Sequence, residues 1–168
     1  NELNKFNKEI CVQRFNKLVK STVANCQRNN ITTLNVVLGG DIIEGIINIS
    51  GRIQQNENVV EQIFTGAELI TEVIVNLSKY VKQVNVWSVN GNHARMSKDT
   101  KEALDGESFE TMLYEYIKMK IALLSHKIDL SNVTLNDNEY PDLAIVHIKN
   151  CNKIVAASHG TKDKKVQT

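Results

Sequence analysis

The chain has 168 residues, of which 42% are hydrophobic, so it has the size of one domain with enough apolar side chains for an ordinary core. Twenty lysines and arginines against nineteen aspartates and glutamates leave a formal charge of +1, which excludes a global field that would hold the chain on nucleic acid or an anionic membrane. Because the apolar runs are too short to span a bilayer and the polar N-terminus lacks a signal-peptide core, we expect one cytoplasmic domain over residues 1–168, with no membrane partner.

The first part of the chain predicts a helix followed by a strand. From Phe6 to Cys26, apolar residues recur at helical spacing with lysine, arginine and glutamine between them, which indicates an amphipathic helix. The valine-rich run over residues 34–38 predicts a buried strand, because Gly39-Gly40-Asp41 ends it abruptly. This glycine turn is a place where chemistry could be positioned.

The middle of the chain repeats the pattern. Apolar residues at helical spacing predict a second helix over residues 58–81, and the apolar run over 84–89 predicts a second strand. Another glycine turn, Gly91-Asn92-His93, follows this strand at once.

The last third of the chain predicts one helix and three strands. Ser108 is expected to precede a helix whose apolar stripe over residues 109–124 faces the core, and the acidic Glu107 and Glu110 near its start suit the helix dipole. Three strands are then expected at residues 133–135, 143–148 and 153–157, the last two joined as a hairpin with its tip at 150–152. This order of helices and strands predicts an α/β domain.

Three of the predicted strands end in polar loops that contain glycine and potential metal ligands. Asp41 lies in the loop over residues 39–45, Asn92 in the loop over 91–95, and His159 just after the last strand. Ligands of open α/β sheets gather at the carboxyl ends of strands, so these loops can converge. Carboxylate, amide and imidazole donors without thiolate favour manganese, iron or zinc. Each loop alone also has a purely conformational explanation, and only the combination indicates a site.

In this combination the chain resembles the metallophosphoesterases, also called calcineurin-like phosphoesterases. Asp41 and Glu44 match the family's Gly-Asp-x-x-(Asp or Glu) motif, Asn92 and His93 match its Gly-Asn-His motif, and His159 matches a separate histidine that follows. The long first helix and the Ile-Glu-Gly sequence of the first loop look most like a phage or bacterial branch. The resemblance implies a two-sheet sandwich flanked by helices, that is, four αββα layers.

Several family features are missing from this sequence. No Asp-x-His occurs before Asp41, no Gly-His-x-His occurs after His159, and Ala94 stands where the Gly-Asn-His motif usually continues with an acid. We therefore expect the chain to be the central portion of a longer protein, without the first and last family motifs. Alone it would supply three ligands and one open, weak site, so we expect it to be poorly active or inactive.

The resemblance also implies roles for individual residues. Asp41 would bridge two divalent cations, with manganese first and iron or zinc as alternatives, and Asn92 and His159 would bind the second of them. His93 would face the scissile phosphate as a charge stabiliser or general acid. Arg95 could also bind the substrate phosphate and Glu44 could orient the Asp41 loop or a water, although a structural role is the simpler explanation for both.

Other charged or titratable residues are weaker candidates. His126 and His147 are left out of the site, because the first lies at a helix end and the second in an alternating strand. The Lys162, Lys164 and Lys165 side chains could steer an anionic substrate, but such a run is usually just solvated.

The function expected from the resemblance is hydrolysis of phosphomonoester or phosphodiester bonds by a water that two metal ions activate. Its partners would be phosphate esters, including nucleic acid or nucleotides, as for a nuclease or a nucleotide phosphatase. A second possibility is a non-catalytic scaffold, or a module that binds nucleic acid or protein and has kept the fold. A third is an unrelated α/β domain, in which Asp41, Asn92 and His159 would lie far apart.

Overall fold

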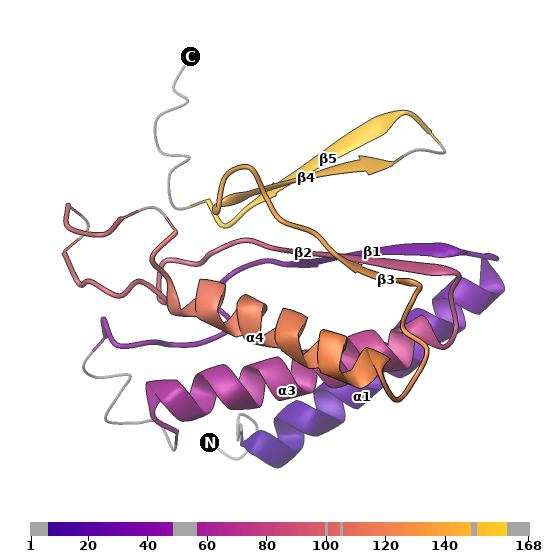
Figure 1. The fold of residues 1–168 in the computed structure, drawn as a ribbon, viewed down its shortest axis with the longest axis horizontal. Helices are drawn as coiled ribbons and strands as arrows, with labels where there is room; N and C mark the ends of the chain where they lie inside the picture. Colours follow the sequence, from indigo (N-terminus) through magenta and orange to yellow (C-terminus); the bar gives the residue numbers. More distant parts are fainter. Residues whose placement is uncertain (1–6, 49–56, 100, 105, 149–150, 161–168) are drawn as a thin grey trace, which may run out of the picture.

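The computed structural model describes residues 7–48, 57–99, 101–104, 106–148 and 151–160 (Figure 1). Some residues named above lie outside these ranges. They are Phe6 at the start of the expected first helix, Asn150 at the expected hairpin tip, and the lysines at 162, 164 and 165. The elements follow the predicted order, which is α1 (Lys8–Arg28), β1 (Thr33–Leu38), α3 (Val59–Ser78), β2 (Gln83–Ser88), α4 (Phe109–Ser125), β3 (Val133–Leu135), β4 (Leu143–Ile148) and β5 (Lys153–Ser158). The prediction of a mixed α/β fold is confirmed.

Each of these helices begins at a side chain that satisfies free backbone amides. Asn7 accepts a hydrogen bond from the Ile10 amide at the start of α1, and Ser108 accepts one from the Glu110 amide at the start of α4. At α3, Asn58 and Glu61 cap each other's backbone amides in a capping box. Such caps contribute about 1 kcal/mol each. They place two helix starts within a residue of the predicted positions.

The sheet β1-β2-β3 is parallel, and two of the helices connect its strands. Leu34 pairs with Val84, and Val86 pairs with Leu135 across the other side of β2. Helix α3 lies between β1 and β2 in the chain, and α4 lies between β2 and β3. All three strands therefore deliver their carboxyl ends to the same edge of the sheet.

The second sheet is the antiparallel hairpin β4–β5, in which Val146 pairs with Val155. Figure 1 shows the three helices on one side of the parallel sheet and this hairpin on the other side. Ala144 and Val146 are buried, whereas Ile145 and Ile154 are exposed on the other face of the hairpin. The hairpin thus ends, at Ser158, on the side of the sheet opposite the helices.

The hydrophobic core lies between the parallel sheet and helices α3 and α4. Its fully buried side chains include Ile74, Val84, Val86, Leu113 and Ile117. Burial of each such side chain contributes about 1.5–3 kcal/mol relative to exposure, so the core fixes the helices over the sheet. Within the described part of the chain, no helix combines the length and the apolar character that crossing a bilayer would require.

The second helix ends earlier than its apolar pattern predicted. Val81 packs against the core, as a helical position would, but α3 stops at Ser78. The Asn132 side chain donates hydrogen bonds to the carbonyls of Ser78 and Val81, and these bonds hold the turn that leads into β2. Burial therefore extends beyond the helix, and periodicity alone could not show where the backbone turns.

Candidate metal centre

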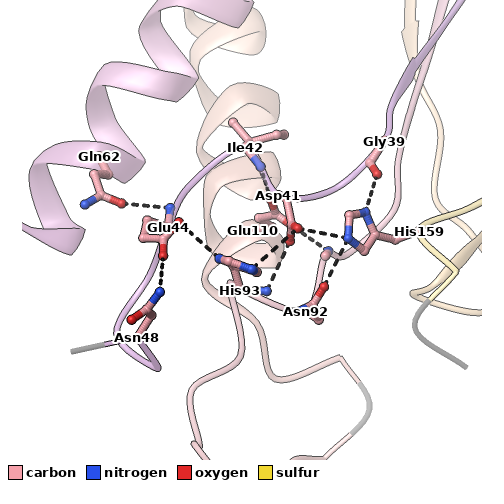
Figure 2. Close-up of polar contacts among 11 residues, drawn as sticks. Gly39, Asp41, Ile42, Glu44, Asn48, Gln62, Asn92, His93, Glu110 and His159 are labelled. Atoms are coloured by element: carbon pink, nitrogen blue, oxygen red, sulfur yellow. Dashed lines mark hydrogen bonds and ion pairs between the residues drawn. The ribbon is translucent and has the colours of Figure 1, made fainter. Parts of the chain in front are cut away.

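Three loops that are remote in the sequence meet at the carboxyl ends of the strands (Figure 2). The His159 Nε2 atom lies 3.0 Å from Asp41 Oδ2 and 3.2 Å from Asn92 Oδ1. Asp41 follows β1, Asn92 follows β2, and His159 follows β5. The structure therefore brings the three expected ligands together, and it does not have the separated arrangement of an unrelated domain with chance loops.

The tautomer of His159 follows from its partner on the other side of the ring. Its Nδ1 atom lies 2.9 Å from the carbonyl oxygen of Gly39, and a carbonyl only accepts, so Nδ1 carries a hydrogen. This hydrogen bond raises the pKa of His159, burial lowers it, and the charge of Asp41 raises it further, with a net increase. The Nε2 atom is therefore directed at the two oxygens, either with a proton or with a lone pair.

These three donor atoms fit a divalent cation. A neutral imidazole would direct the Nε2 lone pair at two acceptor oxygens, Asp41 Oδ2 and Asn92 Oδ1, and this arrangement requires a positive charge between them. Neighbouring ligands about 2.1 Å from an octahedral ion lie about 3 Å from each other, close to the spacing seen here. Among the described residues, no three His, Cys, Asp or Glu side chains are grouped to hold a metal, so the candidate set depends on the amide of Asn92.

Glycines allow the loops to approach this closely. A Cβ atom on Gly91 would lie 2.1 Å from Asp41 Oδ1, and one on Gly40 would lie 2.8 Å from both the Gly91 amide nitrogen and His159 Nδ1. Gly40 also has a φ of +82°, which L side chains rarely adopt. The Gly-Asp and Gly-Asn pairs are thus required by contact between the loops as well as by turn geometry.

Asp41 has an unusual backbone conformation and contacts the second loop. Its φ is 53°, in the left-handed region that short polar side chains such as aspartate tolerate better than most. The Asp41 Oδ1 atom accepts a hydrogen bond of 3.1 Å from the His93 amide, while Oδ2 faces His159. The carboxylate therefore joins the second loop to the histidine after β5.

His93 is oriented by Glu44. The His93 Nδ1 atom lies 3.1 Å from Glu44 Oε2, and its Nε2 atom lies 4.0 Å from Asp41 Oδ2. The Glu44 backbone amide donates to Gln62 Oε1 on α3, and its Oε1 atom accepts from Asn48. Glu44 therefore fixes the ring of His93 beside the ligand cluster, and Figure 2 shows the two side chains meeting across the two loops.

The remaining candidates lie outside this network. The backbone of Arg95 forms a bridge with Ser108, and its Nε atom is buried without a hydrogen-bond partner in the described ranges. No hydrogen bond between described residues joins the Arg95 guanidinium to the ligand cluster. His126 is exposed and caps α4 as the residue after its last turn, and His147 is exposed on β4.

The sequence did not reveal the importance of Glu110. Its side chain is 0% exposed, and its two oxygens accept hydrogen bonds from the amides of Ile42, at 2.5 Å, and Gly91, at 2.6 Å. Burial raises the pKa of Glu110, and the two amide donors oppose the increase. A signal was present, because Glu110 lies three residues before Leu113 and so shares the core-facing side of the helix.

Comparison with known proteins finds similarity at low identity. No family model matches the chain, and no solved structure matches it. The chain is similar to the SPbeta prophage-derived uncharacterized protein YonJ of Bacillus subtilis (strain 168), with 26% identity over 117 residues. This match covers 68% of the chain and 29% of the relative, so the chain spans less than a third of that protein's length.

Proposed function

We propose that this chain carries the central part of a metal-dependent phosphoesterase of the metallophosphoesterase superfamily. One observation carries the proposal, which is that Asp41 Oδ2 and Asn92 Oδ1 both lie within hydrogen-bond distance of His159 Nε2. These are the atoms that the family motifs assign to metal binding, and they come from three loops of unrelated sequence position. The substrate would be a phosphomonoester or a phosphodiester, including nucleotides or nucleic acid.

The residues present would divide the work between holding cations and acting on the substrate. Asp41, Asn92 and His159 would bind manganese, or alternatively iron or zinc, and Asp41 would be a ligand of both ions where two are bound. When bound, the cations would supply Lewis-acid activation of the phosphate ester and of a water nucleophile. The mixed oxygen and nitrogen donor set suits these metals.

His93 would be the catalytic residue beside the cations. Because Glu44 accepts the Nδ1 hydrogen, the Nε2 atom on the Asp41 side is left to donate to a phosphate oxygen or to protonate the leaving group when the ring is charged. Arg95 could add a second positive group for the substrate phosphate if its side chain turns toward the loop of His93.

The wider classification belongs to the same proposal. The helices on one side of the parallel sheet and the hairpin on its other side would form part of an αββα sandwich. The similarity to a prophage-derived protein supports a phage-type branch. A cytoplasmic location agrees with the three cysteines, Cys11, Cys26 and Cys151, which are all free.

Calorimetric titration of the chain with Mn²⁺ tests the metal site. We expect weak binding of one ion, which Asp41→Asn and His159→Ala each remove because they delete a charge or a donor atom. His147→Ala is the matched control, since it removes an exposed histidine from β4 and should leave binding unchanged. Absence of binding to the wild-type chain, or binding that survives both site variants, would contradict the proposal.

Hydrolysis of bis-(p-nitrophenyl) phosphate with added Mn²⁺ distinguishes the enzyme from a scaffold that only kept the fold. We expect little turnover by residues 1–168 alone, and turnover by a longer chain that also holds the missing motifs. In that longer chain, Asp41→Asn should abolish turnover. A longer chain that neither binds Mn²⁺ better nor hydrolyses the ester would favour the scaffold, or a module for binding nucleic acid or protein.

A further inference from the structure

A single buried carboxylate joins the two loops that carry Asp41 and Asn92. Glu110 Oε1 accepts the amide of Ile42, the residue after Asp41, and Glu110 Oε2 accepts the amide of Gly91, the residue before Asn92. Each oxygen therefore holds one loop at a position next to a candidate ligand. Figure 2 shows Glu110 beneath Asp41, between the two loops.

The start of α4 holds Glu110 rigidly in this place. The Ser108 side chain caps the Glu110 amide, and the Phe109 amide donates to the carbonyl of Ala94 in the second loop. The next residue after Glu110, Thr111, exchanges hydrogen bonds with the side chain of Asn90, which lies just after β2. The start of α4 is thus fixed to residues 90–94 at three successive helix positions, and Glu110 reaches from there to the first loop.

Burial of the Glu110 carboxylate has an energetic cost. Glu110 is fully buried and forms no ion pair with a lysine or arginine among the described residues. Its hydrogen bonds from two backbone amides therefore have to offset the cost of removing the carboxylate from water. Burial of an unpaired charge is strongly unfavourable, and burial accordingly raises the pKa of this group. Violations of this kind concentrate at functional sites.

We propose that Glu110 is a positioning residue that sets the separation between the Asp41 and Asn92 loops and so assembles the cation site. The inference rests on the proposed function, because the ligands that it positions are those of the proposed centre. It adds a residue that none of the family motifs found in the sequence contains. Only a carboxylate of this length offers two acceptor atoms to two amides at once.

Two substitutions separate reach from charge. Glu110→Gln keeps the shape, but its amide nitrogen would face a backbone N–H as donor against donor, so one loop is released. Glu110→Asp keeps the charge but is shorter by one methylene, so it cannot reach both amides. We expect both variants to weaken Mn²⁺ affinity by about tenfold to a hundredfold, as loss of a supporting hydrogen bond does at metal sites.

Tyr114→Phe is the matched control on the same helix. Its hydroxyl lies 3.0 Å from the carbonyl oxygens of both Val86 and Asn136, which share its single hydrogen, and no hydrogen bond among the described residues joins it to either loop. This variant should lower thermal stability while leaving Mn²⁺ affinity unchanged. Affinity is measured by calorimetry well below each unfolding temperature, and circular dichroism verifies that the helices are intact.

Amide hydrogen exchange gives a readout that does not depend on metal. In the wild-type chain without added Mn²⁺, the amides of Ile42 and Gly91 should be protected, and in Glu110→Gln at least one of them should exchange faster by about tenfold or more. Wild-type affinity in both Glu110 variants would overturn the positioning role. If the wild-type chain binds no Mn²⁺ at all, the proposed function fails. If the Ile42 and Gly91 amides of the wild type are unprotected, Glu110 does not hold the two loops, and the positioning role fails whatever the metal does.

Discussion

His93 and Glu44 form a hydrogen-bonded pair across two loops, with Nδ1 of the imidazole 3.1 Å from a carboxylate oxygen. A carboxylate that accepts a hydrogen bond from one ring nitrogen fixes the tautomer of the imidazole and the direction in which the second ring nitrogen points. Glu44 therefore does more than complete the Gly-Asp motif, because it determines which atom of His93 faces Asp41.

Removal of this carboxylate should release the His93 ring. In Glu44→Ala we expect the ring nitrogens to show a mixture of tautomers, because no acceptor remains for Nδ1, whereas the wild type holds its hydrogen on Nδ1. Nitrogen chemical shifts of His93, measured by NMR, report the tautomer directly. Asn48→Ala is the control, since it removes a partner of Glu44 and leaves the pair with His93. A single unchanged tautomer in Glu44→Ala would contradict this role.

Adding a methyl group at Gly91 should separate the two loops. The Cβ atom of Gly91→Ala would lie 2.1 Å from Asp41 Oδ1 and 2.2 Å from the Asp41 backbone nitrogen, so the loop itself must move, and we expect Mn²⁺ affinity to fall by about tenfold or more. Gly39→Ala is a close control, because nothing lies within 4 Å of its added Cβ and its carbonyl still accepts from His159. Calorimetry on both variants tests this, and equal affinities would show that the loop contact is unimportant.

Acid should weaken cation binding through His159. The proton and the cation compete for Nε2, and the Gly39 carbonyl, with the charge of Asp41, raises the pKa of this imidazole. Affinity for Mn²⁺ should be nearly constant above that pKa and fall by about tenfold per pH unit below it. A pH series of titrations measures this, and His159→Gln should bind less tightly with a smaller dependence on pH. An affinity that rises as pH falls would be the opposite result.

The raised pKa of His159 also makes the stability of the metal-free protein depend on pH. A group whose pKa is higher in the folded state stabilises the fold when protonated, so the contribution of His159 is complete below its ordinary pKa. That contribution is lost as pH rises through the folded-state pKa. Urea unfolding of the wild type across this range, compared with His159→Gln, should show a decline in stability that the variant lacks.

Tyr114 should stabilise the contact between α4 and the sheet without affecting the site. Loss of the buried hydroxyl, whose one hydrogen is shared between two backbone carbonyls, should lower the free energy of unfolding in Tyr114→Phe by about 1–2 kcal/mol. Tyr140→Phe is the control, because that side chain is exposed. Urea denaturation of both variants tests the difference, and equal losses would show that the buried hydroxyl contributes nothing.

Local patterns were enough to predict the elements of the fold. The apolar stripe of α3 is buried at helical spacing, which is the period that the sequence displays. The valine-rich run predicted β1, although that strand is half-buried rather than buried because it lies at an edge of the sheet. Helix ends were less predictable, as at Ser78, because the turn there depends on Asn132 from a distant segment. Backbone hydrogen bonds to remote side chains leave no periodic signal.

The candidate site shows a similar division. Asp41 and Asn92 were predictable because glycine loops after neighbouring parallel strands meet at one edge of the sheet. His159 follows a strand of the separate hairpin, so only its place in the motif combination pointed to the site. Glu110 was not, because its place depends on which side of α4 faces the loops, and an acidic residue in a first helical turn already has an ordinary explanation. Its hydrogen bonds to Ile42 and Gly91 join segments whose contact only the tertiary structure reveals.

The hairpin β4–β5 belongs to a different sheet from β1 and β2, and it supplies His159 while they supply Asp41 and Asn92. A cation bound by all three residues would crosslink two layers whose strands form no hydrogen bonds with each other's sheet within the described ranges. Cation binding would then attach the whole hairpin more tightly to the rest of the molecule, including parts of the hairpin that are distant from the ion.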